Sequence, residues 1–136
     1  MTPTLAAFTG FVSWSLCLLV LMEAIRTKLV ATRAVPAHGF TPDNSNLSPF
    51  MQRLARAHAN CVEGLPIFGG LMLIAVVAGK SALTDPLAYY FLAARVLQSL
   101  IHLISANAMA VTLRFACFAV QMGIGAYWAA RLLVVG

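Results

Sequence analysis

The chain has 136 residues, enough for a single domain; 61% of them are hydrophobic and only 10% are charged. Soluble domains carry about 25% charged residues, so the composition excludes an ordinary water-soluble protein and indicates an integral membrane protein. The net charge is +5. Because most of the basic residues flank one connection between apolar segments, this charge does not indicate nucleic-acid binding. We expect one membrane domain over residues 1–136.

Four apolar segments predict four transmembrane helices and therefore an all-α bundle. The first, Met1 to Met22, contains no charged residue and spans roughly 30 Å as a helix, the thickness of a bilayer core. It lacks the basic start of a cleaved signal peptide, so we expect a retained helix. The remaining segments are Gly64 to Gly79, Pro86 to Leu113, which Arg95 interrupts, and Phe115 to Ala130.

The connection Thr27–Leu47 is the only long one, and it is rich in turn-forming residues. Ser48 followed by Pro49 is typical of an N-cap and a first helical residue, so the second helix should run from Pro49 to about Val77. Pro66 lies inside it and should bend it.

The same cap-then-proline pattern at Asp85–Pro86 predicts the start of the third helix. Ser105 to Thr112 is the expected third connection. Its limits are poorly defined because alanine and methionine favour helices.

Basic residues concentrate around the first connection: five of the nine Lys and Arg residues flank it, namely Arg26, Lys28, Arg33, Arg53 and Arg56. By the positive-inside rule this connection, residues 27–47, should be cytoplasmic, with both termini on the opposite side of the membrane.

A polar stripe should run down the start of the second helix. At about 100° per residue, Arg53, Arg56, Asn60 and Glu63 fall within an arc of about 80°. Two interpretations stay open. Arg56 and Glu63 can neutralise each other as a structural ion pair, or the stripe can bind a ligand.

The third and fourth helices carry polar residues of their own. Arg95, Gln98, Ser99 and His102 share one face, and an arginine inside a membrane helix must face the bundle interior or a wet cavity. A structural partner for Arg95 would be Glu63 or Glu23. On the fourth helix, Arg114 and Gln121 share a face, where Arg114 either extends to the membrane surface or belongs to a site.

Two further side-chain groups have simple structural interpretations. Glu23 can pair with Arg26 one turn further along the first helix. Cys17, Cys61 and Cys117 are odd in number and dispersed, so they predict neither a disulfide framework nor a metal site, and we expect small packing residues.

Most of the polar groups should meet at the level of the cytoplasmic leaflet. A positive cleft there, open to an apolar interior, suits an anionic small molecule that reacts with a lipophilic one. The residues expected at this level are Arg26, Arg33, Arg53, Arg56, Asn60, Glu63, His102 and Arg114.

The segment RAHANCVEGLPIF, which begins at Arg56, resembles the signature of the membrane-associated proteins in eicosanoid and glutathione metabolism, the MAPEG superfamily. The motif residues are Arg56, Asn60, Glu63, Pro66 and Phe68. The chain length, the four apolar segments, the long first connection and the arginine on the third helix extend the resemblance over the whole chain.

The resemblance implies a four-helix bundle that assembles as a homotrimer surrounded by membrane lipid, with glutathione bound as co-substrate between protomers near the cytoplasmic side. It assigns Arg56, Asn60 and Glu63 to the glutathione backbone and Arg114 to activation of the thiol. Further candidate glutathione-binding residues are Arg33, Arg95, Gln98 and His102.

Three functional hypotheses follow. The leading one is a membrane-bound glutathione-dependent transferase acting on lipophilic electrophiles, with peroxidase activity as an additional option. A non-catalytic MAPEG-fold binder of a lipid or thiol is the alternative, because the chain departs from the family pattern at Ala59, Gly64, Gln98 and His102. A small four-helix transporter is disfavoured, since Glu23 lies at the end of its apolar run rather than deep within it.

Overall fold

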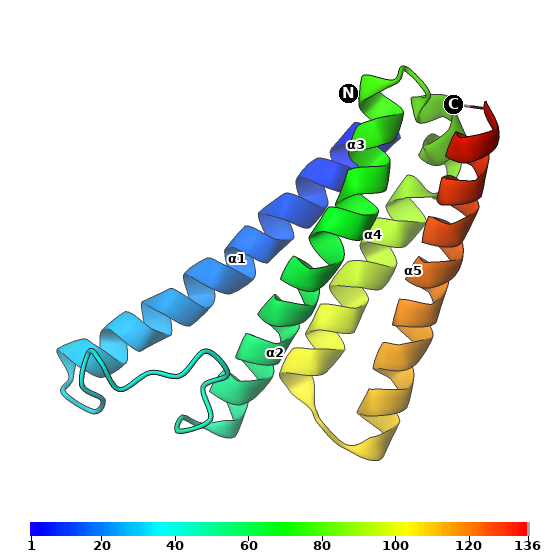
Figure 1. Cartoon of the computed structure of the whole chain (residues 1–136). Coiled ribbons are helices and arrows are strands. Elements are labelled where there is room, and N and C mark those ends of the chain that lie inside the picture. The colour runs from blue at the N-terminus through cyan, green and yellow to red at the C-terminus, as the bar shows by residue number, and fades with distance from the viewer. Residues whose placement is uncertain (136) are drawn as a thin grey trace.

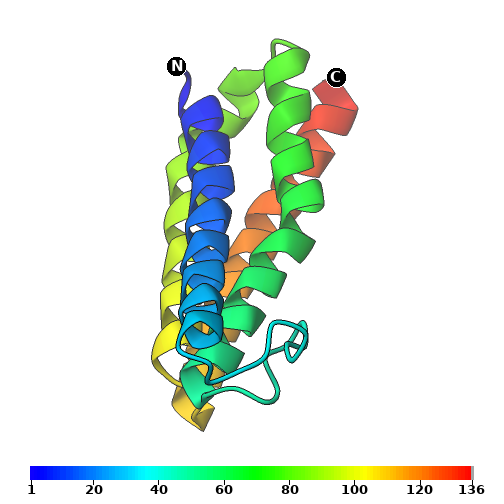
Figure 2. The same cartoon turned by 90° about the vertical axis from the view of Figure 1, so that its left-hand side faces the viewer.

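The computed structural model describes residues 1–135, and within them all regular structure is helical. Four helices are long and apolar enough to cross a membrane: α1 (Pro3–Ala31), the composite helix Pro49–Val77, α4 (Ser81–Ile104) and α5 (Ala108–Val135). They run up and down, so both termini lie at one end and the long first loop lies at the other (Figures 1 and 2). The expected four-helix bundle is confirmed.

The second membrane helix consists of α2 (Pro49–Gly64), the π-helical turn η1 (Leu65–Gly69) and α3 (Gly70–Val77). Ser48 caps its start, because the serine hydroxyl accepts a hydrogen bond from the Met51 N–H at 3.3 Å. Pro66 has no N–H to donate, and the helix widens into the π turn around it. The predicted extent, Pro49 to about Val77, is confirmed.

The predicted start of the third helix at Asp85–Pro86 is wrong. Helix α4 begins earlier, at Ser81, and Pro86 lies inside it. The Asp85 carboxylate instead accepts hydrogen bonds from the backbone N–H and the hydroxyl of Thr4, at 3.0 Å and 2.6 Å. Asp85 therefore caps the first turn of a neighbouring helix rather than its own.

The first and third connections between the membrane helices are shorter than expected. Helix α1 continues to Ala31, so the first loop starts at Thr32. The third connection contains only residues 105–107, because Asn107 accepts a hydrogen bond from the Ala110 N–H at 2.8 Å and so caps α5. This short turn keeps the start of α5 close to the end of α4.

Helix α4 is central to the bundle and contacts α1, α2, α3 and α5. An aromatic cluster joins the helices: the ring of Phe91 lies 5.7 Å from Phe11, 5.0 Å from Phe68 and 5.6 Å from Trp128, measured between centroids. All four side chains are buried. A Cβ at Gly125 would lie 2.8 Å from the Phe68 ring, so glycine is what allows α5 to approach η1.

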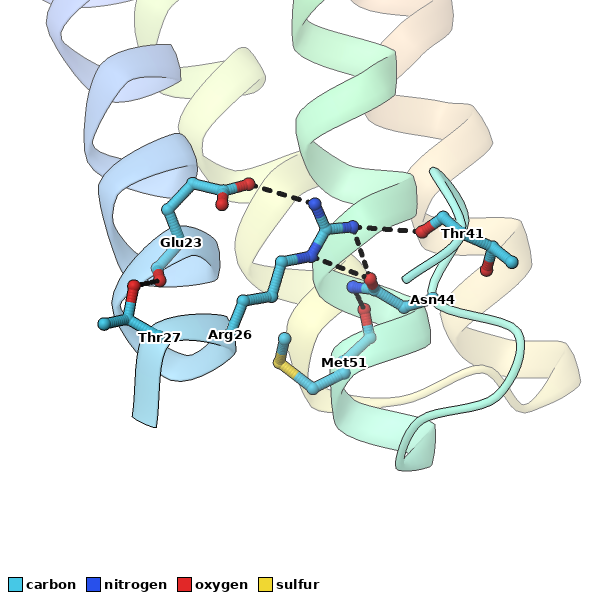
Figure 3. A network of polar contacts seen from close by, with 6 residues as sticks. All are labelled: Glu23, Arg26, Thr27, Thr41, Asn44 and Met51. Atoms are coloured by element: carbon cyan, nitrogen blue, oxygen red, sulfur yellow. Dashed lines mark hydrogen bonds and ion pairs between the residues drawn. The ribbon is translucent and has the colours of Figure 1, made fainter. Parts of the chain in front are cut away.

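The long loop is fastened to the helices by a polar network (Figure 3). Arg26 donates to the Asn44 Oδ1 and to the Thr41 carbonyl, while Asn44 donates to the Met51 carbonyl at 2.8 Å. Asn44 is buried and has a left-handed φ of 56°. The expected Glu23–Arg26 ion pair is confirmed at 3.0 Å. The network holds the loop beside the start of α2.

Labelling with a membrane-impermeant maleimide tests the predicted orientation. His38 is exposed in the long loop, and Ala82 is exposed in the first turn of α4. The start of α4 and the long loop lie at opposite ends of the bundle (Figure 1). A cysteine at His38 should react from the cytoplasmic side and a cysteine at Ala82 from the other side, because the basic residues flank the long loop. The unsubstituted chain is the control. Labelling of both positions from one side would contradict the topology.

Candidate functional site

A polar cavity of about 840 Å³ lies between α2, the start of α5 and the long loop. All four residues of the predicted polar stripe on α2 line it, so the periodicity argument is confirmed. His102, at the end of α4, and Arg114, in the second turn of α5, complete the wall. The ionisable and amide side chains that line it are Asp43, Gln52, Arg53, Arg56, Asn60, Glu63, His102 and Arg114.

None of the charged side chains that line this cavity forms an ion pair with another described residue. Within residues 1–135 the one ion pair joins Glu23 to Arg26, outside the cavity. Arg56 and Glu63 therefore do not neutralise each other in this structure, which goes against the purely structural interpretation of the stripe. Arg53 donates to the Leu103 carbonyl at 3.0 Å and anchors α2 to the end of α4.

Asp43, at the loop side of the cavity, is held by its own loop. Hydrogen bonds from the Thr41 hydroxyl and the Ser45 backbone N–H lower the pKa of its carboxyl below the usual value. These hydrogen bonds stabilise the ionised form of the carboxyl group.

Arg95 lies behind the cavity, with only 1% of its surface exposed. Its Nη1 donates to the Asn60 Oδ1 at 2.5 Å, and its guanidinium stacks over the Phe11 ring at 5.3 Å from the centroid. The prediction that Glu63 or Glu23 pairs with Arg95 is wrong. The Arg95 guanidinium contacts the Asn60 amide and the face of the Phe11 ring instead. A Cβ at Gly64 would lie 3.0 Å from the Arg95 Nη2, so glycine makes room for the guanidinium.

A chain of carboxamides extends from Asn60 to α5. The Gln98 Nε2 donates to the Asn60 Oδ1 at 3.3 Å, and the Gln121 Nε2 donates to the Gln98 Oε1 at 2.7 Å. Both glutamines are buried. Gln121 was not among the predicted site residues. The sequence did indicate it in one way, because Gln121 is a polar residue on the same helix face as Arg114.

The expected packing role of the cysteines holds for only one of them. Cys61 is buried and its sulfur lies 3.3 Å from the Ser99 hydroxyl, between α2 and α4. Cys17 is exposed on α1, and Cys117 is half-buried on α5.

An apolar groove of about 530 Å³ adjoins the polar cavity, and Asn60 and Glu63 line both. Ile67, Phe68 and Leu71 form one wall of the groove, and Phe118, Met122, Gly125, Ala126 and Ala129 of α5 form the other. The two cavities together offer a charged compartment next to an apolar one.

The predicted site residues fall into three groups. Five line the polar cavity: Arg56, Asn60, Glu63, His102 and Arg114. Arg95 and Gln98 lie behind it and reach it through Asn60. Arg33 is exposed just beyond α1, with a left-handed φ of 61°, and is not part of the wall formed by the described residues.

Four membrane-length helices with a charged cavity beside the long loop are typical of an integral membrane protein. The model of the MAPEG family matches residues 4–134, nearly the whole chain, so the chain belongs to the MAPEG family. Neither a search of curated proteins nor a search of solved structures gave a match.

Proposed function

We propose that this protein is a membrane-bound transferase that joins glutathione to lipophilic electrophiles, with a peroxidase reaction as a related activity. Family membership supports the proposal, because the MAPEG family includes glutathione transferases. The observation that carries it is the polar cavity, where Arg56, Arg114 and Glu63 form no ion pair with any of residues 1–135 and which an apolar groove adjoins.

Glutathione complements this cavity chemically, since it carries two carboxylates, one ammonium group and a thiol. Guanidiniums bind carboxylates through paired charge-assisted hydrogen bonds, which suits Arg56. Glu63 suits the ammonium group as an acceptor, and Asn60 adds a neutral hydrogen-bonding group between them. The lipophilic substrate would occupy the apolar groove.

Arg114 is the proposed activator of the thiol. A nearby guanidinium lowers the cost of forming the thiolate, which is the nucleophilic species. The thiol proton passes to water, and the thiolate attacks the electrophilic carbon to form the new S–C bond. In a substitution the leaving group departs with its bonding electron pair; in an addition the displaced electron pair stays on the electrophile and takes up a proton from water. Arg114 lines the same cavity as Arg56 and His102, which supports this role.

Assembly as a homotrimer is part of the proposal. On α5, the small residues Ala119, Gly123, Ala126 and Ala130 are exposed, which suits close contact with another helix. A contribution of Arg33 to the site would come from a neighbouring protomer, because Arg33 lies away from the cavity of its own chain. Native mass spectrometry from a mild detergent should show three copies. A stable monomer or dimer would count against assembly.

A conjugation assay with glutathione and a chromogenic aryl halide tests the activity of the purified protein in detergent. The proposal predicts protein-dependent formation of the thioether that saturates with glutathione. Saturable glutathione binding without turnover would favour the alternative, a non-catalytic binder. The alternative is based on the departures from the family pattern at Gln98 and His102.

A further inference from the structure

The side-chain amides of Asn60, Gln98 and Gln121 form a hydrogen-bonded chain. The groups at its two ends determine which side of each amide is the oxygen and which is the nitrogen. At one end, the Arg95 guanidinium has only donors, so the atom of Asn60 at 2.5 Å from it must be the oxygen. At the other end, the Cys117 carbonyl is only an acceptor, so the atom of Gln121 at 3.1 Å from it must be the nitrogen.

These two constraints agree with each other. With the Gln121 nitrogen facing Gln98, the Gln98 oxygen must accept at 2.7 Å, and the Gln98 nitrogen is then turned to the Asn60 oxygen at 3.3 Å. Rotating any one carboxamide by half a turn would set two donors or two acceptors against each other. The chain therefore has one arrangement in which every contact between its carboxamides joins a donor to an acceptor, and it crosses from α5 through α4 to α2.

This arrangement fixes which end of the Asn60 side chain faces the cavity. Both hydrogen bonds that the structure gives its side chain end at Oδ1, so the NH₂ group is the part left for the cavity. Asn60 is half-buried and lines both the polar cavity and the apolar groove. It lies one helical turn from Glu63, which presents only acceptors when ionised.

We infer that Gln98 and Gln121 are positioning residues that, together with Arg95, hold the Asn60 carboxamide with its NH₂ group towards the cavity. The junction of the two cavities then presents a donor at Asn60 and an acceptor at Glu63. The ligand group at Asn60 must be an acceptor, a carbonyl or carboxylate oxygen or a thiolate sulfur, and the group at Glu63 must be a donor. The inference rests on the proposed glutathione-dependent function and assigns a specificity role to residues that lie behind the cavity wall.

The first readout needs no ligand. In protein labelled with ¹⁵N at asparagine and glutamine side chains, hydrogen exchange of each NH₂ group is followed by NMR, with the Asn60 signal assigned by its loss in Asn60→Asp. The Asn60 NH₂ should exchange readily with water, whereas the Gln98 and Gln121 NH₂ groups should be protected by burial and hydrogen bonding. A protected Asn60 NH₂ would overturn the inference.

The second readout is the affinity for glutathione. Gln121→Met keeps the side-chain size but removes the donor that fixes the direction of the Gln98 carboxamide. Gln98 can then turn away from the Asn60 oxygen, Arg95 alone is left to orient Asn60, and binding should weaken roughly fivefold. Turnover at saturating glutathione should stay unchanged, because Gln121 does not touch the reacting sulfur. The control Thr84→Val removes a buried contact to Thr4 at the other end of α4 and should leave the affinity unchanged.

The outcomes separate the two proposals. If wild-type protein does not bind glutathione, the proposed function fails, and side-chain exchange still decides the amide direction. If wild-type protein binds glutathione and Gln121→Met behaves like Thr84→Val, the positioning role is refuted while the function stands. Should Gln121→Met not fold, the exchange measurement on wild-type protein decides.

Discussion

Arg114→Ala should lower turnover with a model electrophile by about 100-fold, a loss typical of removing one preorganised electrostatic group from an active site. The affinity for glutathione should change little, because the Arg114 charge acts chiefly on the developing thiolate and not on the ends of the peptide. Steady-state kinetics with glutathione and an aryl halide separate kcat from the glutathione KM.

Arg131→Ala is the matched control for this substitution. Arg131 is exposed on the same helix, near its opposite end, and its contact is with Tyr127, one turn away. Its removal should leave both kinetic constants unchanged. Unchanged turnover in Arg114→Ala would remove this residue from the mechanism and direct attention to His102, the imidazole in the same cavity wall.

Glu63→Gln should weaken glutathione binding by about 1–3 kcal/mol through loss of a charge-assisted hydrogen bond to the ammonium group. Glu63 is exposed to the cavities and has no ion-pair partner within residues 1–135. The melting temperature of the ligand-free protein should therefore stay close to that of the wild type. Calorimetric titration and thermal unfolding of the same variant measure both quantities.

The matched control is Glu23→Gln, which removes the carboxylate that does pair with an arginine. It should lower the melting temperature slightly without changing glutathione affinity, since surface ion pairs contribute about 0–1 kcal/mol. If Glu63→Gln instead destabilised the ligand-free protein and kept its affinity, Glu63 would be a structural counter-ion.

Much of this architecture follows from local patterns in the sequence. Hydropathy identifies the four spans because a bilayer needs about 20 apolar residues per helix. Helical periodicity brings Arg53, Arg56, Asn60 and Glu63 to one face, and they do line one cavity. Ser48 and Pro49 predict the start of α2 because a cap and its first residue act over a single turn.

The remaining features depend on contacts between helices. The periodicity of a single helix does not predict such contacts. Asp85 has the residue type of a cap for its own helix, yet it caps α1, because the two helix starts lie side by side. The partner of Arg95 depends on the relative depth and rotation of α2 and α4, which put Asn60 rather than a carboxylate beside it. The role of Gln121 likewise requires knowing which face of α5 meets Gln98.

The connection between α4 and α5 could not be delimited from the sequence. Alanine and methionine favour helices, so the composition between Ser105 and Thr112 did not define where α5 begins. The hydrogen bond from the Ala110 N–H to Asn107 defines it. The resulting three-residue turn brings Arg114 into the polar cavity, together with Arg56.

Calorimetric titration of the purified, folded protein with glutathione tests the central claim most directly. The account predicts saturable binding that weakens with added salt, because the cavity recognises charged groups. A glutathione analogue with both carboxylates converted to amides should bind much more weakly. Absence of saturable binding to a monodisperse, folded sample, or equal binding of the amidated analogue, would contradict the claim that this cavity is a glutathione site.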